Sequence, residues 1–578
     1  MTKKAHILSF LLVIICLIFS VFLEHPSSFD SERKQLKKEL SDFKVEYRGS
    51  CSDSSQNGIC LDKDKFILID GEKRKPLKPY IPLGPAGIFI PMVCFVIASL
   101  TKKIFWGFIY THIFALIYFV ISGFSSHLIG SIERIFFSSF KIQILAFTIL
   151  LITMGKIMLR NGAVDAVFDF CSKKIKSRAG VQLMAYLNGL LIFFDDYANT
   201  VIVGTSFQSI FDRFKISRAK LAYIVDSTAA PLAGIMLFST WIGFEIECIK
   251  GAIETTSLDK RGAYEIFLES VPFRLYCIFA LMLVFIGILS GREFPAMSRS
   301  KIFKPSTASG LANDEIHRKS SLLSFVLPLI AVLSVMLVGL ILESKHQINN
   351  YLSFSEWRLL LQNIEDISPV LLAASSAGLL ISLLFVLPRP KPLKIVKESF
   401  SSSFSVVFPI LGLLFSAWFI ADLVKILNTP DYILLFIPDG IAPNFWPLIV
   451  FLLAASISFT TGSSWTVMGV LLPLMIPLLS SYGLDQTLLV ISVAMIMDGA
   501  VFGDHVSPIS DTTVMSSLSS GCDLIEHVKT QLPYALLAAF TSIILLQLSL
   551  NFSLPILFLY LVAGISMYLT LKSFGLKS

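Results

Sequence analysis

Residues 194–200 read FDDYANT and lie near the middle of an apolar stretch that runs from 179 to 212. Basic residues flank the stretch at Arg178 and Arg213, and such residues mark the cytoplasmic ends of membrane spans. The stretch is too long for one crossing, which takes roughly 20 residues, yet both of its ends are predicted on the same side. It therefore predicts a re-entrant hairpin with Asp195 and Asp196 at its tip, where irregular backbone is tolerated only within protein or beside a watery cavity.

A second apolar stretch of hairpin length runs from 445 to 481, and its tip at 460–466 reads TTGSSWT. The basic loops place both ends of this stretch outside, so it mirrors the first. Each hairpin follows three spans and precedes a broken span and a further span, once within 81–290 and once within 322–550. Two such blocks of opposite orientation form an inverted repeat, which is typical of secondary transporters.

Composition supports a membrane protein and excludes a soluble one. The chain has 578 residues, of which 54% are hydrophobic and only 15% charged, with a mean hydropathy of +0.74. The net charge of +7 lies in loops, where it sets orientation, and it implies no nucleic-acid partner. The predicted fold is an all-α polytopic membrane protein with about 12 transmembrane helices, two re-entrant hairpins and discontinuous helices.

The individual spans follow from apolar runs long enough to cross the bilayer. An N-terminal anchor helix is expected at 1–23, an external polar loop at 24–79, and a C-terminal helix and tail at 553–578. Between them we expect spans at 81–99, 104–122, 142–159, 221–243, 272–290, 322–342, 369–387, 402–421, 487–520 and 531–550. The eight cysteines lack metal-ligand spacing, and only Cys51 and Cys60, in the external loop, could form a disulfide.

Two of these spans contain a proline beside acids and hydroxyls. Pro231 follows the sequence Asp226-Ser227-Thr228 and frees the carbonyl of Ser227, because proline disrupts the helical bond to the residue four positions back. Pro508 frees the carbonyl of Asp504 in the same way. A plain kink lining a watery vestibule is the alternative. Recurrence in both halves favours a site for a hard cation, which prefers oxygen ligands.

Each acid at the first tip has two candidate roles. Neighbouring residues on a helix point about 100° apart, so one of Asp195 and Asp196 is expected to reach a cavity while the other caps a half-helix. Asp498 is a candidate relay acid, and His505 could titrate near neutral pH. Glu245 and Glu247 fall at the outer end of a span, where charge is normal, and are not candidates. The predicted sodium- and proton-binding residues are Asp195, Asp196, Asn199, Thr200, Asp226, Ser227, Thr228, Thr461, Ser463, Ser464, Asp498, Asp504, His505, Ser507, Asp511 and Thr512.

The motifs resemble those of the NhaC-type sodium/proton antiporter family, within the ion transporter superfamily. The matching strings lie at 194–197, 212–231, 461–465, 499–513 and 530–534, and the resemblance covers roughly 80–550. Ser463 stands where the family more often has threonine. The resemblance implies exchange of sodium for protons, and it also admits relatives that exchange a proton-coupled dicarboxylate for sodium and a monocarboxylate.

Three functions follow from these observations. Exchange of sodium for protons across the inner membrane by alternating access is the leading hypothesis, with the lipid bilayer, sodium ions and protons as partners, no other cofactor, and a homodimer left open. Organic-anion exchange of the malate/lactate type is the alternative, and the absence of Arg or Lys from the tips and broken motifs disfavours it. An intramembrane aspartyl protease using Asp196 and Asp504 is a remote third, so no enzyme is expected.

Overall fold

The computed structural model describes most of the chain. The described residues are 46–48, 58–62, 65–70, 73–76, 86–101, 104–121, 138–163, 166, 177–254, 256, 258, 261–300, 321–344, 356, 360, 364, 366–427, 429–434, 437–438 and 440–577. The predicted anchor helix at 1–23 lies outside them, as does Cys51, so the anchor and the disulfide with Cys60 stay predictions.

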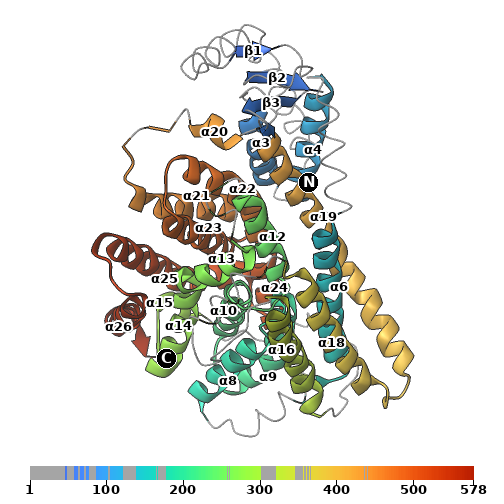
Figure 1. The fold of residues 1–578 in the computed structure, drawn as a ribbon. Helices are drawn as coiled ribbons and strands as arrows, with labels where there is room; N and C mark the ends of the chain where they lie inside the picture. Colours follow the sequence, from blue (N-terminus) through green and yellow to red (C-terminus); the bar gives the residue numbers. More distant parts are fainter. Residues whose placement is uncertain are drawn as a thin grey trace.

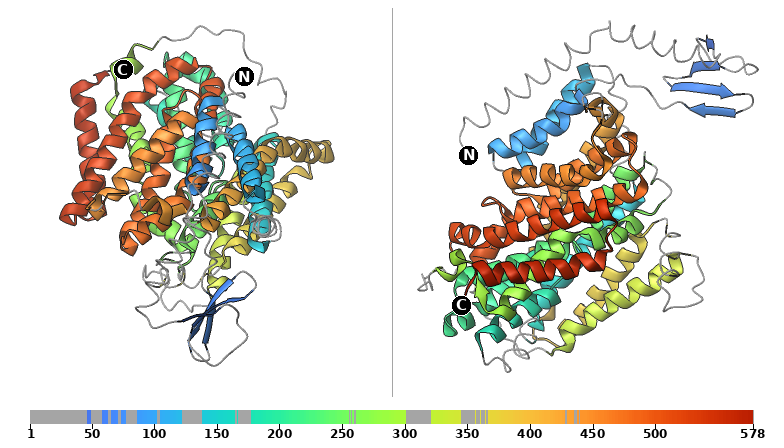
Figure 2. Two further views of the ribbon diagram at one scale, coloured as in Figure 1. Left: turned by 90° about the horizontal axis from the view of Figure 1, so that it is seen from above. Right: turned by 90° about the vertical axis from the view of Figure 1, so that its left-hand side faces the viewer.

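Helices make up the body of the molecule, and they lie roughly alongside one another (Figure 1, Figure 2). Within the described residues, eight helices are long and apolar enough to cross a membrane, and a ninth span arises if the bent pair Ala263–Phe273 and Leu275–Ser290 is counted as one. The eight are α6 (Ser139–Arg160), α16 (Leu323–Glu343), α18 (Ser368–Val386), Pro443–Thr461 with α21 (Trp446–Thr461), α22 (Ser464–Ser481), α23 (Gln486–His505), α25 (Leu524–Phe552) and α26 (Ile556–Phe574). The chain is therefore a multi-pass membrane protein.

The remaining helices follow the predicted segments closely in most places. They are α3 (Ala86–Thr101), α4 (Ile104–Ile121), α8 (Arg178–Leu191), α9 (Asp196–Arg213), α10 (Arg218–Thr228), α11 (Ala230–Ala233), α12 (Ile242–Ile253), α13 (Ala263–Ser270), α14 (Leu275–Ser290), α15 (Pro295–Ser298), α19 (Pro392–Ile426), α20 (Thr429–Leu434) and α24 (Asp511–Ser520), with short 3-10 turns η1 (Val271–Phe273) and η2 (Pro443–Phe445).

The predicted span 221–243 is interrupted at the proline motif, as the sequence predicts. The chain leaves helical geometry at Ala229, whose φ of −90° and ψ of −97° end α10, and α11 lasts only four residues. Pro231 lies in the first turn of α11, where N–H groups have no intrahelical partner, so the missing N–H of proline costs no helical hydrogen bond. The next helix, α12, begins only at Ile242, so the break in this half is longer than the sequence predicts.

The all-α fold class needs correction in the polar segment 24–79, which was predicted as an external loop. Four short strands form one sheet in the order β1 (Glu46–Arg48), β2 (Gly58–Asp62), β3 (Lys65–Asp70) and β4 (Lys73–Pro76). Asp62 pairs with Lys65, and Asp70 pairs with Lys73, so only two residues connect each antiparallel pair. The β-branched and aromatic residues of β2 and β3 favour strands, and this was overlooked because the segment is rich in charge. A further short pair, β5 (Arg292–Glu293) with β6 (Leu576–Lys577), joins the C-terminal end to the end of α14.

Helices at the centre differ from those at the edge in how much of them is buried. The apolar windows of α22 and α23 are 78% and 83% buried, against 28% for α16 and 22% for α26. Large apolar side chains of α16 and α26, such as Leu342 and Leu557, are exposed. Such a surface suits lipid contact, while the central helices carry the polar residues of interest.

Glycines allow α23 to lie directly against α21. A Cβ at Gly499 would collide with the carbonyl oxygen of Phe451, and one at Gly503 would collide with that of Ala455. Ser458 adds a hydrogen bond from its hydroxyl to the carbonyl oxygen of Ala500, at 2.6 Å. Small residues are the usual means of bringing membrane helices close, and here they hold the second tip beside the end of α23.

Candidate ion-binding site

Both predicted tips are breaks between two helices, and the two breaks have the same local geometry. Asp195 precedes α9 with φ −154° and ψ 122°, and Ser463 precedes α22 with φ −153° and ψ 110°. The carboxylate of Asp195 accepts a hydrogen bond from the backbone N–H of Ala198 at 2.6 Å, and the hydroxyl of Ser463 accepts one from that of Thr466 at 3.4 Å. Asp195 therefore has the capping role that was predicted for one member of the acidic pair.

Asn199 holds two helix breaks together. Its side-chain amide donates to the carbonyl oxygens of Gly189 at 2.7 Å and Ile192 at 3.3 Å, which end α8. The same amide donates to the carbonyl oxygen of Thr228 at 2.8 Å, where α10 ends. Helix ends leave carbonyls without intrahelical partners, and the two N–H groups of this amide reach three carbonyl oxygens at two such ends. The carbonyl oxygen of Gly189 also accepts from the backbone N–H of Ile192 at 3.2 Å. Asn199 thus positions the site through its amide nitrogen, and Thr228 donates its own hydroxyl to Ile224 within α10.

Asp226 is the most heavily bonded acid of the predicted set. It is buried, and its Oδ1 accepts from the hydroxyl of Ser516 at 3.0 Å. Its Oδ2 accepts from Thr513 at 3.3 Å and from the amide of Gln531 at 2.7 Å. Nε2 of His527 lies 3.2 Å from the same oxygen. These partners come from α24 and α25, so Asp226 ties α10 of the first predicted repeat to two helices of the second.

The sequence prediction missed His527 and Gln531. Both are buried on α25, and they stand four residues apart, so they share one helix face. That spacing of two polar residues within an apolar span is the signal that could have found them. His505, which was predicted, lies on the other side: its Nε2 is 3.7 Å from Oδ2 of Asp226, and its Nδ1 is 2.6 Å from the hydroxyl of Tyr276.

Asp504 lies at the end of α23, beside the second tip. Its Oδ2 accepts from the hydroxyl of Ser464 at 2.8 Å and from that of Thr512 at 3.5 Å. Its Oδ1 is buried and has no hydrogen-bond partner among the described residues. The break between α23 and α24 is fastened to the tip by Ser507, whose hydroxyl donates to the carbonyl oxygen of Phe459 at 2.8 Å. Hydroxyls from two separate breaks thus surround one carboxylate.

Helix α24 brings the first tip to this place. Asp511, in its first turn, accepts a short hydrogen bond from the hydroxyl of Tyr197 on α9. Asp196 precedes Tyr197 and is buried at the start of α9. Ser510 caps α24 and lies 2.9 Å from the hydroxyl of Thr512. The tips and broken motifs therefore meet around α24, which packs against both α9 and α10.

Several predicted residues have local partners instead. The hydroxyl of Thr200 donates to the carbonyl oxygen of Tyr197 at 2.8 Å, and that of Thr461 donates to Ile457 at 2.8 Å, each within its own helix. Ser227 is buried in α10, next to Asp226.

Asp498 lies apart from the group around α24, although it was predicted in the same site. Nε of Arg274 is 2.9 Å from its Oδ1, and the backbone N–H of Tyr276 donates to its Oδ2 at 2.6 Å. Glu245 also contacts Arg274, with 3.5 Å between Oε1 and Nη1. Glu245 and Glu247, which were expected to be ordinary charges at the outer end of a span, are both buried, at 0% and 8% exposed. Their partners come from distant segments, which a local pattern does not reveal.

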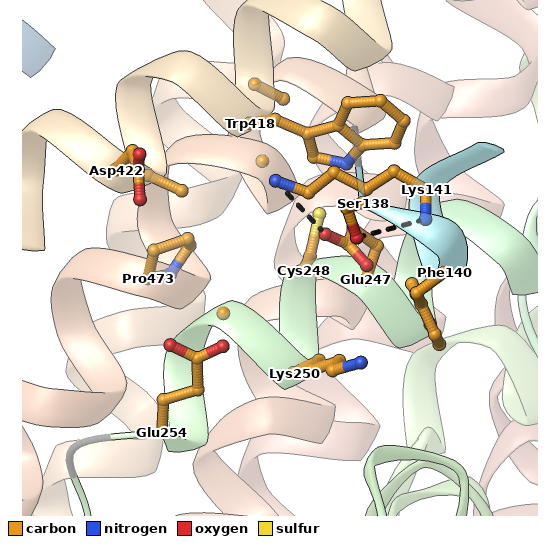
Figure 3. A pocket seen from close by; sticks show the side chains of 14 residues that line it. Ser138, Phe140, Lys141, Glu247, Cys248, Lys250, Glu254, Trp418, Asp422 and Pro473 are labelled. Carbon is orange, nitrogen blue, oxygen red and sulfur yellow. Dashed lines mark hydrogen bonds and ion pairs between the residues drawn. The ribbon is translucent and has the colours of Figure 1, made fainter. Parts of the chain in front are cut away.

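A separate cavity of about 540 Å³ lies among α6, α12, α19 and α22. Figure 3 shows Lys141 in it, with Nζ 3.8 Å from Oε1 of Glu247 and placed over the ring of Trp418. Lys250 also lines the cavity, and Asp422 and Glu254 lie on another part of its wall. The cavity is therefore lined by side chains of both charges.

The chemistry of the α24 group suits a small cation with oxygen ligands. No cluster of three or more His, Cys, Asp or Glu side chains able to hold a metal ion occurs in the described part of the chain. A sodium ion would instead combine one or two carboxylates with hydroxyl and carbonyl oxygens, as Asp504, Ser464 and Thr512 offer.

Comparison with known proteins places the chain in a family. Residues 232–549 match the Na+/H+ antiporter family. An uncharacterized protein of Haemophilus influenzae is 30% identical over 402 residues, which cover 68% of this chain and 76% of that protein. The Na+/H+ antiporter NhaC of Alkalihalophilus pseudofirmus is 28% identical over 123 residues, or 21% of this chain and 25% of that protein.

A third relative is the malate-2H+/Na+-lactate antiporter of Bacillus subtilis, 33% identical over 94 residues, which are 16% of this chain and 19% of that protein. The family match covers more than half of the chain, and it contains the second tip, the break before α24 and the residues of α25 that contact Asp226. This chain belongs to the Na+/H+ antiporter family.

Proposed function

We propose that this transporter exchanges sodium ions for protons across the inner membrane by alternating access. The observation that carries the proposal is the buried carboxylate of Asp504, which two hydroxyls contact through Oδ2 while Oδ1 has no partner among the described residues. A buried carboxylate needs a proton or a cation to balance its charge. The two can therefore compete for the same group, which is the chemical requirement of an antiporter.

Each acid around α24 has a distinct place in the proposal. Asp504 binds the sodium ion or the proton, with Ser464, Thr512 and the carbonyl groups of the break supplying further oxygens. Asp511 and Asp196 lie at the adjoining helix starts and bring negative charge to the entrance of the site. Asp226, with four side-chain partners, keeps the broken helices in register.

The proposed architecture has about 12 transmembrane helices, with the breaks at 192–195 and 462–463 at the tips of two re-entrant hairpins of opposite orientation. The matched capping geometry of Asp195 and Ser463 supports it, because equivalent positions in an inverted repeat are expected to share local structure. The glycine at the second tip, Gly462, adopts a left-handed conformation with φ 67°, as a tight reversal requires.

Alternating access needs a barrier between the site and each side of the membrane. The rings of Phe244 and Trp465 stack at 4.6 Å between centroids, and Trp241 meets Trp465 edge-on at 5.8 Å. Trp465 follows Ser464, which contacts Asp504, and Gly469 on the same helix lines the 540 Å³ cavity. We infer that these rings close the site toward that cavity, which lies on the side predicted to be external.

Flux in membrane vesicles tests the proposal. Vesicles containing the purified protein and an internal pH dye are given an acid interior, and sodium is then added outside. We expect the interior to become alkaline with wild-type protein and to stay acid with Asp504→Asn. Asp523→Asn, which changes the exposed N-cap of α25, is the matched control and is expected to behave as wild type. A wild-type protein that leaves the pH gradient intact on sodium addition would contradict the proposal.

Organic-anion exchange is the second candidate, and one observation favours it. The sequence argument against it was the lack of positive charge at the tips, but the cavity of about 540 Å³ is lined by Lys141, whose amine lies over the ring of Trp418, and by Lys250, whose amine lies over the ring of Phe140. A cavity of this size suits a small organic ion. A relative named as a malate/lactate antiporter adds to the case. Sodium-dependent uptake of labelled malate or lactate that is lost in Lys250→Gln would support this candidate, and uptake absent from wild type would remove it.

The protease alternative has no comparable support. Asp196 and Asp504 have partners on different helices, with Ser464 bonded to Asp504, and the family to which the chain belongs is one of transporters.

A further inference from the structure

Arg274 lies between two carboxylates in the interior, away from the acids around α24. Its Nε is 2.9 Å from Oδ1 of Asp498, and its Nη1 is 3.5 Å from Oε1 of Glu245. The same Nη1 donates to the carbonyl oxygen of Gly234 at 2.9 Å. All three charged side chains are 0% exposed. The three residues come from α12, the start of α14 and α23, and we call them the Arg274 triad.

The Arg274 triad has an unbalanced negative charge if both acids are ionised. One guanidinium and two carboxylates leave a net charge of −1, and removing an unbalanced charge from water costs several kcal/mol even after relaxation. A proton on one of the two acids would restore neutrality. The question is which acid holds it.

Hydrogen bonding distinguishes the two acids. Asp498 has a donor on each oxygen, Nε of Arg274 on Oδ1 and the backbone N–H of Tyr276 on Oδ2, and this arrangement suits the ionised form. Glu245 has only the long contact of its Oε1 to Arg274, and its Oε2 is buried without a hydrogen-bond partner among the described residues. The proton therefore belongs on Glu245.

Other charged groups lie on α12 and on the helices packed against it. On α12 itself, Glu247 faces Lys141 of α6, 3.8 Å away. Helix α22, which packs against α12, carries no ionisable side chain between 464 and 481. Further titratable or charged groups on the packed elements include Cys248 and Lys250 on α12, Lys156 on α6, Asp422 on α19, and Cys277 beside Arg274. Helix α13 carries Tyr264, Glu265 and Glu269, and the two glutamates pair with Arg261.

A structural connection joins Glu245 to the proposed ion site. Phe244, its neighbour on α12, stacks on Trp465, and Trp465 follows the serine that contacts Asp504. On the α14 side, Tyr276 contacts Asp498 through its backbone and His505 through its hydroxyl, and His505 is next to Asp504. A rearrangement of the second tip would therefore change the surroundings of Glu245.

We propose that Glu245 is a second proton-binding residue of the transporter, protonated in this conformation and released when the second tip moves. The release half of the proposal rests on the sodium/proton exchange proposed above, whereas the protonation half rests only on the triad. Glu245 is thus a proton carrier separate from the acids around α24, held next to an arginine whose charge Asp498 already neutralises.

Infrared spectroscopy of the purified protein tests protonation without any transport. We expect wild type at neutral pH to show a protonated carboxyl C=O band that is lost in Glu245→Gln, read from the wild-type-minus-variant difference spectrum so that any band of Asp504 cancels. We also expect Asp498→Asn to lose this band, because Arg274 then has Glu245 as its only carboxylate partner and the glutamate ionises. Glu265→Gln, a buried glutamate already paired with Arg261, is the matched control and should keep the band. A difference spectrum that lacks this band for either Glu245→Gln or Asp498→Asn overturns the proposal, and the second variant decides if the first does not fold.

Flux then tests release. In vesicles that contain wild-type protein, protons moved per sodium ion are measured from the pH dye and from labelled sodium. We expect Glu245→Gln to move fewer protons per sodium ion than wild type and than Glu265→Gln. An unchanged ratio overturns the release half. A wild type without sodium-dependent flux, combined with loss of the infrared band in Glu245→Gln, would remove the proposed function and leave Glu245 as a protonated residue, so the two failures are distinguishable.

Discussion

The carboxylate of Asp226 and the side-chain amide of Gln531 are joined by a hydrogen bond of 2.7 Å, although 305 positions separate them in the sequence. The amide of Gln531 also reaches the carbonyl oxygen of His505 at 2.5 Å, where α23 ends. One side chain of α25 thus bonds to a broken helix from each predicted repeat. The contact fixes how the two halves meet, and it explains why Asp226 is so heavily bonded.

Replacing Asp226 with asparagine is expected to destabilise the protein and to abolish exchange. In asparagine an NH2 group replaces one carboxylate oxygen, so donors such as Gln531 and His527 lose their acceptor. Hydrogen bonds to a charged group are worth about 1.5 to 3 kcal/mol each. The apparent melting temperature in detergent should fall by several degrees. Asp212→Asn, which breaks the partly exposed pair with Arg218, should change it little. Equal shifts in the two variants would contradict the assignment.

Two substitutions of Asp195 separate its capping role from the role of its charge. Asparagine caps a helix about as well as aspartate, so Asp195→Asn should alter the free energy of unfolding by less than about 1 kcal/mol, whereas Asp195→Ala should lose about 1 to 2 kcal/mol. Sodium-dependent proton flux in Asp195→Asn then decides the role of the charge. We expect flux to persist, because the carboxylate is occupied by the backbone N–H of Ala198. Loss of flux at unchanged melting temperature would make Asp195 an ion carrier.

Removing the amide of Asn199 should be costly because it bridges two helix breaks. Asn199→Ala leaves the carbonyl of Thr228 without this donor in a buried place, and an unsatisfied buried group costs about 1 to 3 kcal/mol. We expect a drop in melting temperature and loss of flux. Asn188→Ala is the control, since that amide donates only to Met184 within its own helix. The two variants should differ clearly, and similar stability in both would argue against the bridging role.

Gly462 combines a left-handed backbone with a close approach, and the two effects can be measured apart. A Cβ at this position would lie 2.8 Å from the carbonyl carbon and oxygen of Ile509, in the break before α24. Gly483 has φ 99° and nothing within 4 Å of the same Cβ, so Gly483→Ala reports the backbone strain alone, about 1 kcal/mol. Gly462→Ala should be less stable than Gly483→Ala and should also lose sodium-dependent flux. Equal stability would show that the tip does not need the close contact with Ile509.

Local sequence features predicted the places where helices start and break. Both tips were predicted as turns between two half-helices, and a capping role was expected for one acid of the first tip, which Asp195 fills. The capping role of Ser463 at the second tip was not predicted. The proline at 231 predicted a break, but its extent was underestimated, because the chain between α11 and α12 is held by contacts such as the hydrogen bond from Thr240 N–H to the carbonyl oxygen of Phe194. A local pattern cannot contain a bond to a residue 46 positions away.

Acids near span ends show the limit of sequence reasoning most clearly. Asp498 was predicted as a relay acid in the site and Glu245 as an ordinary charge at the outer end of a span, yet both contact Arg274 in the interior. The charge of a side chain is visible in the sequence, whereas its burial and its counter-charge depend on helices from three parts of the chain.

The sequence by itself determined that this protein spans the membrane many times and where its helices break, because apolar length and proline, glycine and capping residues act over a few neighbouring positions. Only the tertiary structure decided that Asp226 bonds to Gln531, that α24 joins the two tips, and that Arg274 lies between two buried acids. These pairings arise from packing between distant helices, where each buried polar group must find a partner wherever the fold supplies one.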